Sequence, residues 1–219
     1  MEELLKKVAQ IREKCGQYGD EIGQLLGILK EAEDPRRGCF PMVFNHSTFT
    51  LEVLSYYQSI WTKPRVISSP EEGDRLRKQN AERCNKALKW LFIGSLSSIE
   101  YSAKASIASY PENSPAKNLI KVRGRYVYLG DIMHNSLNYG LISDNECEDW
   151  QNLIFLRNCI VHNNAISDRD KTLDIAGMSI EASAGKMLQG KLDFFAIVNE
   201  VAIERYFTWV KALIKEYGK

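Results

Sequence analysis

The sequence has no long apolar run and no excess of one charge. No stretch approaches the ~20 consecutive apolar residues that a membrane-spanning helix needs. The first residues, MEELLKKVAQIREK, are charged throughout and are therefore unlike a secretory signal. The formal net charge is +1, so any surface that attracts nucleic acid must be local. We expect a cytoplasmic protein without membrane contact.

Cysteine and histidine are too few and too scattered to suggest a metal centre or a disulfide scaffold. The chain has five cysteines and three histidines. No two cysteines have the spacing of a zinc knuckle or a redox pair. Hydrophobic residues at 44% and charged residues at 26% are ordinary globular proportions. A chain of 219 residues can bury a core that needs no such support. We expect free thiols, no metal and no cofactor.

Apolar residues recur every three or four positions in the first part of the chain, which predicts helices. In the first segment the steps alternate between four and three, close to a heptad seam. Gly19, Gly23 and Gly27 recur on another face, where they either let a neighbouring helix approach or break the helix in two. The sequence DPRRG indicates a turn. The predicted elements are a helix over 1–32, a turn at 34–38 and a helix over 47–61.

Two capping boxes mark the starts of further helices. In the sequence SPEE, Ser69 can cap the first free N–H groups, the proline suits the first helical position, and Glu72 completes the box. Ser143 and Glu146 repeat this pattern. Gly140 suits the left-handed position that follows a helix. These signals predict helices over 70–109, over 128–139 and from Ser143 to Asn163.

The last part of the chain combines a weak pattern with a strong one. Glycines punctuate short alternating pieces over 172–192, which indicates an irregular insert or a small β-hairpin. Residues 193–217 show one continuous apolar face and predict a helix. The predicted fold class is therefore mainly all-α: a bundle of long antiparallel helices with a small insert. We expect one domain over 1–219, in which 1–45 forms an N-terminal helical extension.

One short segment, Arg157-Asn158-Cys159-Ile160-Val161-His162, concentrates polar side chains at the end of a predicted helix. Asn158 and His162 are about 40° and ~6 Å apart on a helix, so their side chains can touch. Arg157 is about 140° from His162, so only its long side chain can reach the same ligand. A guanidinium offers a forked donor to phosphate, and an imidazole moves protons near neutral pH. Together they form a minimal set for metal-free phosphodiester cleavage.

The ordinary alternative is a helix end without chemistry. A histidine in the last turn is favoured by the helix dipole, and an arginine there commonly forms a surface ion pair. A cysteine nucleophile is disfavoured, because Cys159 and His162 diverge by about 60° on a helix and no glycine-rich elbow is near. The spacings of phosphate-binding loops are absent. His46 and His134 are interpreted as non-functional.

The segment resembles the Arg-x4–6-His signature of the HEPN superfamily, in the form Arg-Asn-x-x-x-His followed by Asn163. The surrounding pattern agrees: a helix, a glycine turn, an acidic helix and then the motif. HEPN domains also tend to carry a glutamate and, one turn later, a lysine on an earlier long helix, and Glu100 and Lys104 match this pattern. The alternative for this pair is a surface ion pair worth ~0.3 kcal/mol. The resemblance covers about 86–164.

The resemblance implies a helical bundle that forms a homodimer, with two motifs in a shared cleft. It further implies a metal-independent endoribonuclease that leaves 2′,3′-cyclic phosphate ends. Such enzymes act in toxin–antitoxin or abortive-infection defence, which implies an antitoxin or another defence protein as partner. His162 is then the general base or acid, Arg157 stabilises charge on the phosphate, and Asn158 orients either group. Glu100 would hold Arg157 or His162, with Lys104 and Asn163 in support.

Basic and aromatic residues flank the motif helix in the sequence. Basic side chains can line a groove for an RNA backbone, and tyrosines can stack on unpaired bases. The alternative is a solvated loop with structural tyrosines. The predicted RNA-binding residues are Arg123, Arg125, Tyr126 and Arg169.

Three interpretations of the whole chain stay open. The first is the endoribonuclease described above. The second is a non-catalytic HEPN-like module that binds RNA, a nucleotide or a protein through the same cleft. The third is a purely structural helical protein, in which Arg157 and His162 satisfy buried polar needs. The intact motif favours the first.

Overall fold

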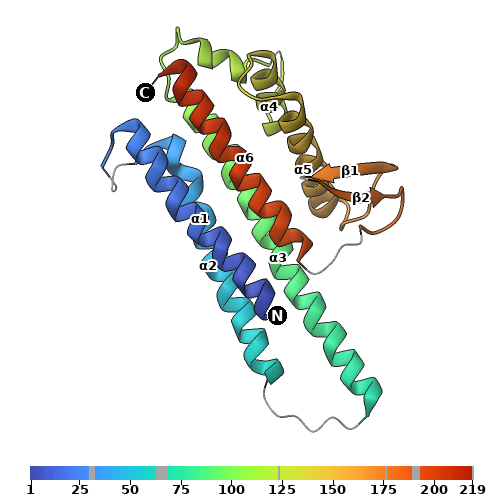
Figure 1. Cartoon of the computed structure of the whole chain (residues 1–219). Coiled ribbons are helices and arrows are strands. Elements are labelled where there is room, and N and C mark those ends of the chain that lie inside the picture. The colour runs from blue at the N-terminus through green and yellow to red at the C-terminus, as the bar shows by residue number, and fades with distance from the viewer. Residues whose placement is uncertain (30–32, 63–68, 123, 176, 189–192, 219) are drawn as a thin grey trace.

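The computed structural model describes residues 1–29, 33–62, 69–122, 124–175, 177–188 and 193–218. Within these residues the chain is mainly helical, as predicted, with a small antiparallel sheet of two strands (Figure 1). None of the described helices has a stretch long and apolar enough to cross a membrane. The elements are α1 (Glu2–Leu26), α2 (Pro35–Thr62), α3 (Pro70–Ala108), η1 (Pro115–Ile120), α4 (Leu129–Asn138), α5 (Asp144–His162), β1 (Lys171–Ile175), β2 (Met178–Ala182) and α6 (Phe194–Tyr217).

Four long helices form the body of the molecule. In Figure 1, α2 runs antiparallel to α1 and α3, whereas α6 points in the same direction as α1 and α3. Both α2 and α6 contact α1 and α3. The shorter α4, α5 and the β-hairpin lie together beside α3 and α6 (Figure 1). One hydrophobic core cluster includes residues of both parts, so α5 is built on the same core as the long helices.

The apolar stripe of α3 and the predicted apolar face of α6 form much of this core. Complete burial of a large aliphatic or aromatic side chain contributes roughly 1.5–3 kcal/mol, and the largest buried side chains include Trp150 of α5 and Trp209 of α6. The stripe of α3 is buried along its whole length and consists of Leu88, Phe92, Leu96, Ile99, Ala103 and Ile107.

Two predictions about the N-terminal part were wrong. The first helix ends at Leu26, because Gly27 takes the left-handed conformation that closes a helix (φ 67°); residues 30–32 lie outside the described part. The predicted turn at 34–38 is the start of α2, which begins at Pro35 and not at residue 47. The Asp34 carboxylate accepts a hydrogen bond from the Arg36 N–H (2.9 Å), which stabilises this start.

The predicted glycine face of the first helix proves to be a packing surface. A Cβ atom at Gly19 would lie 3.4 Å from the Cβ of Phe40, and one at Gly23 would lie 3.7 Å from the guanidinium of Arg37. Both neighbours belong to α2. Both distances are ordinary van der Waals contacts, so this glycine face lies in the interface between α1 and α2, at the cost of helix propensity.

The predicted helix ends after residue 69 are confirmed. The Ser69 hydroxyl accepts a hydrogen bond from the Glu72 N–H (3.2 Å), and Ser143 forms a complete capping box with Glu146. Gly140 is left-handed (φ 70°). No element was predicted between the helices over 70–109 and 128–139, where residues 115–120 form the 3-10 helix η1. Apolar periodicity does not predict this helix, because it is short and begins at a proline.

The predicted insert contains a real hairpin. Strands β1 and β2 pair from Lys171 opposite Ala182 to Ile175 opposite Met178. Gly177 lies in the turn with φ 78°. The rest of the predicted insert is irregular up to Leu188, and residues 189–192 lie outside the described part.

Candidate functional site

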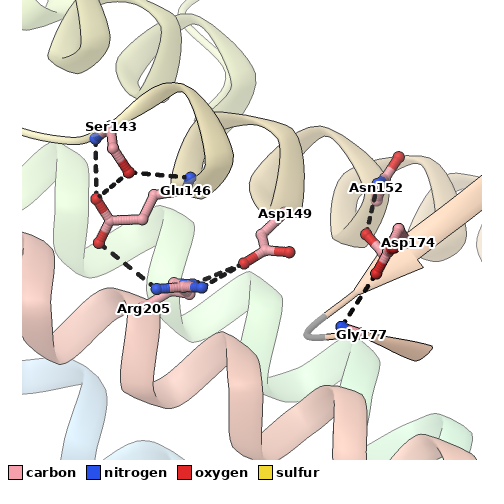
Figure 2. A network of polar contacts seen from close by, with 7 residues as sticks. All are labelled: Ser143, Glu146, Asp149, Asn152, Asp174, Gly177 and Arg205. Atoms are coloured by element: carbon pink, nitrogen blue, oxygen red, sulfur yellow. Dashed lines mark hydrogen bonds and ion pairs between the residues drawn. The ribbon is translucent and has the colours of Figure 1, made fainter. Parts of the chain in front are cut away.

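The N-terminal half of α5 is fixed by a network of charged and polar side chains (Figure 2). Arg205 of α6 lies between two carboxylates of α5: its nitrogens are 2.6 Å from Asp149 and 3.6 Å from Glu146. One turn further on, the Asn152 side chain donates to the backbone carbonyl of Asp174 in β1 (2.8 Å). Helix α5 is therefore joined to α6 on one side and to the hairpin on the other.

The C-terminal end of α5 is closed by a sharp turn directly after the motif. The helix ends at His162, and Asn163 follows as its C-cap. Asn164 and Ala165 are both left-handed (φ 51° and 67°), a conformation that costs a residue with a Cβ roughly 1–2 kcal/mol. The Ala165 N–H donates to the Cys159 carbonyl (2.8 Å), and its own carbonyl accepts from the Leu188 N–H (2.8 Å). The insert thus holds this turn in place.

Residues of the motif line one pocket together with residues of α3 and α4. The pocket has a volume of about 360 Å³. Both Arg157 and His162 face it, although they are about 140° apart on the helix. Glu100 of α3 also lines it, although it is 57 residues away from Arg157 in the sequence. The lining residues are Leu96, Glu100, Tyr128, Leu129, Gly130, Ile154, Arg157, Asn158 and His162.

Arg157 is incompletely satisfied in this pocket. Its Nε is buried and has no hydrogen-bond partner. A buried donor without an acceptor costs about 1–3 kcal/mol, more when it is charged. Asn158 and His162, in contrast, are exposed. The pocket therefore combines a guanidinium that lacks an acceptor with an amide and an imidazole open to solvent.

Glu100 accepts a hydrogen bond from Lys104 (2.6 Å), one turn later on α3. Among the described residues no hydrogen bond joins Glu100 to Arg157 or His162. The Glu100 side chain is only 18% exposed, so the pair is more than a surface contact. The Lys104 ammonium also lies 5.9 Å from the centre of the ring of Tyr128, which lines the pocket. Glu100 thus positions Lys104 in this structure.

The start of α4 was missing from the predicted site. Tyr128, Leu129 and Gly130 line the pocket. The first N–H groups of a helix have no acceptor within it and carry the positive end of the helix dipole, which suits an anion. The Asp131 carboxylate accepts from the Tyr128 N–H (2.9 Å) and so fixes the start of the helix. The sequence predicted that a helix starts near residue 128. It did not reveal that this start lies beside the motif, because that depends on how α4 packs against α5.

Of the predicted RNA-binding residues that the structure describes, none lines the pocket. The two oxygens of Asp131 accept hydrogen bonds from Arg125 (2.6 and 2.8 Å), which lowers the pKa of this carboxyl below its usual value. Tyr126 is 86% exposed.

Arg169 pairs with Asp168 (3.0 Å) and lies over the ring of Phe155. Arg123 is outside the described residues, and Lys104 and Asn163 also do not line the pocket.

Two other kinds of chemistry receive no support at this helix end. Burial raises the pKa of the Cys159 thiol, which disfavours the reactive thiolate. Within the described residues, no three His, Cys, Asp or Glu side chains come together in a way that would hold a metal ion.

Comparison with known proteins gives no relative: no family model, no curated protein and no solved structure matches this chain.

Proposed function

We propose that this protein is a metal-independent endoribonuclease of the HEPN type. One observation carries the proposal: Arg157, Asn158 and His162 line a single pocket, in which the Arg157 Nε is buried without an acceptor. A structural arginine is normally saturated by its neighbours. An unsatisfied guanidinium beside an exposed imidazole is instead suited to an anionic ligand from outside the chain.

In this proposal, each side chain has a role in cleaving an RNA phosphodiester. His162 takes the proton of the 2′-hydroxyl or delivers one to the leaving 5′-oxygen. Arg157 stabilises the charge that develops on the phosphate, as the first N–H groups of α4 would on the opposite wall. Asn158 is one helical turn from His162 and orients the imidazole or the phosphate. The products are a 2′,3′-cyclic phosphate and a 5′-hydroxyl.

A second copy of the chain would complete the site. Next to the motif, exposed apolar side chains include Val161 of α5, Ile166 and Met187; the last two pair through a β-bridge. Exposed apolar groups gathered on one surface favour association. We propose a homodimer in which this surface brings two motifs together. Sedimentation of the purified protein tests this part of the proposal.

The biological setting follows from the resemblance alone. HEPN nucleases of toxin–antitoxin and anti-phage systems act in the cytoplasm and are restrained by partner proteins. We extend this setting to the present chain: cytoplasmic, with RNA as substrate and an antitoxin or another defence protein as partner.

A second candidate function is binding without turnover. Glu100 pairs with Lys104 and does not orient His162, and this observation favours a module that holds RNA or a nucleotide in the pocket. Such a module would show salt-sensitive RNA binding without products.

The chemistry can be tested with one chimeric substrate. We expect the wild-type protein, with EDTA present, to cut a DNA oligonucleotide that contains one ribonucleotide only on the 3′ side of that ribonucleotide. The product should carry a 2′,3′-cyclic phosphate, because only the ribonucleotide supplies the attacking 2′-hydroxyl. The all-deoxy oligonucleotide is the control and should stay intact. A strict need for Mg²⁺, or cleavage of the control, would refute the proposal.

A further inference from the structure

A second hollow lies between α2 and α3, outside the motif pocket. It is a groove of about 670 Å³. We call this hollow the α2–α3 groove. Figure 1 shows that the end of the helix pair where α2 finishes and α3 begins extends beyond α6 and the α4–α5 region. Its lining residues are His46, Phe49, Thr50, Val53, Tyr57, Arg83, Lys86, Ala87, Trp90, Leu91, Ile93 and Gly94.

Both walls of the groove present aromatic rings to solvent. Phe49 of α2 is 66% exposed and Trp90 of α3 is 62% exposed. Tyr57 adds a third ring, half-buried on the α2 side. Single exposed rings are common, whereas exposed apolar groups that gather in one groove mark a binding site. Rings on facing walls provide flat surfaces on which unpaired bases can stack.

The charged residues that line the groove carry one sign. They are Arg83 and Lys86, both exposed, and no carboxylate lines the groove. The Arg83 guanidinium lies 5.8 Å from the centre of the Tyr57 ring, so one ligand can contact both the cation and the ring. The net charge of the whole chain is only +1, so the groove is a local concentration of positive charge. It suits a polyanion that also carries flat apolar groups, which describes a single-stranded nucleic acid.

The groove and the motif pocket lie along one helix. Ile93 lines the groove and Glu100 lines the pocket. These residues are seven apart on α3, which places them within about 20° of the same face and ~10 Å apart along the axis. Ser97, between them on that face, is exposed and short. The surface between the two hollows therefore has no large side chain in the way on α3.

We propose that the α2–α3 groove binds a single-stranded RNA segment next to the part held in the motif pocket. The bases stack on Trp90 and Phe49, and Arg83 and Lys86 contact the phosphates. The preference for RNA over DNA rests on the proposed function, whereas the groove itself requires only unpaired bases on a phosphate backbone.

Tryptophan fluorescence reads this binding directly. Of the four tryptophans, Trp150 and Trp209 are fully buried, and only Trp61 and Trp90 are exposed. In the Trp61→Phe protein, a change in solvent-exposed indole emission reports on Trp90. We expect oligouridylate and oligothymidylate both to quench this emission. Oligothymidylate has no 2′-hydroxyl, so it cannot be cut and gives a binding constant that is independent of catalysis.

Substitutions in the groove should weaken the binding in two separable ways. Trp90→Ala is expected to weaken oligothymidylate binding about tenfold or more, measured by anisotropy of a labelled oligonucleotide. Replacing Arg83 and Lys86 together by glutamine should reduce the slope of log K against log salt by about 1.4, or about 0.7 for each cation. Tyr139→Ala and Lys78→Gln are matched controls, because both residues are exposed and neither lines the groove. Thermal unfolding confirms that each variant is folded.

The outcomes separate this inference from the proposed function. Quenching of Trp90 by oligothymidylate in a protein that never cleaves RNA supports the groove and refutes the nuclease. RNA cleavage without any Trp90 quenching, or with unchanged affinity in Trp90→Ala, overturns the groove. Polyglutamate has no bases. If it quenches Trp90 as strongly as oligothymidylate does and displaces oligothymidylate, the inference is overturned and an acidic protein partner is favoured.

Discussion

Each half of α5 has an arginine beside it or on it, and the two arginines are in opposite states. In the N-terminal half, Arg205 reaches in from α6 and is shared by Asp149 and Glu146. In the C-terminal half, Arg157 has a buried Nε without an acceptor, beside the exposed His162. Saturated charges stabilise a fold, whereas an unsatisfied one costs free energy and persists where a ligand uses it. The comparison sets a paired charge network in one half of α5 against the proposed site in the other.

The largest expected effect is on catalysis in the C-terminal half. His162→Ala should lower the rate of RNA cleavage about 10²- to 10⁴-fold, because it removes the group that transfers protons. The free energy of unfolding should change by less than about 0.5 kcal/mol, because the side chain is exposed. The matched control is His134→Ala, an exposed histidine that does not line the pocket. Cleavage by His162→Ala at the wild-type rate would remove the catalytic assignment.

The next effect is on stability in the N-terminal half. Arg205→Met leaves Asp149, whose side chain is 10% exposed, without its guanidinium. We expect the free energy of unfolding in urea to fall by about 1–3 kcal/mol, less than for a fully buried pair because Arg205 is 32% exposed. The control is Arg77→Met, which breaks an exposed pair with Asp74 and should cost less than about 1 kcal/mol. Equal losses in both variants would contradict a structural role for the Arg205 network.

A smaller effect distinguishes two roles for Glu100. Since it binds Lys104 and makes no hydrogen bond to Arg157 or His162, Glu100→Gln should cost about 0.2–0.5 kcal/mol of stability. It should alter KM for RNA through the freed lysine and leave kcat near the wild-type value, as steady-state kinetics would show. A tenfold fall in kcat at unchanged KM would instead assign Glu100 the orienting role that the resemblance implies.

The smallest contrast expected concerns the two cysteines of α5. Cys147 and Cys159 lie in different halves, and burial raises the pKa of both thiols. Since only the thiolate reacts, both should be alkylated slowly by iodoacetamide at neutral pH and rapidly in denaturant. Mass spectrometry of the alkylated peptides measures this. Rapid native labelling of Cys159 alone would indicate that the motif end of the helix opens.

Local signals in the sequence were sufficient for most of the helices. Apolar periodicity and caps such as Ser69 and Gly140 act within one or two turns, so they can be recognised without the fold. The start of α2 was missed because Gly38 and Pro41 disfavour a helix locally. Tertiary packing overrides this preference: a Cβ on Gly38 would lie 3.5 Å from the Ser102 hydroxyl of α3, a contact that no local pattern reveals.

The candidate site divides in the same way. Arg157, Asn158 and His162 lie within two turns of one helix, so their proximity follows from helix geometry. Glu100 was named from the resemblance alone, and its place on the pocket wall depends on how α3 packs against α5. The contribution of the α4 start and the pairing of Arg125 with Asp131 depend on turns and packing, which the sequence does not specify at this level.

The most direct measurement is the paired effect of Arg157→Met on stability and on cleavage in one preparation. If the guanidinium serves a ligand, its removal relieves a buried unsatisfied donor. The variant should then unfold at the wild-type urea concentration or higher, while RNA cleavage falls about 10²-fold or more. A variant that loses ~2 kcal/mol of stability while folded molecules cleave RNA at the wild-type rate would contradict the account.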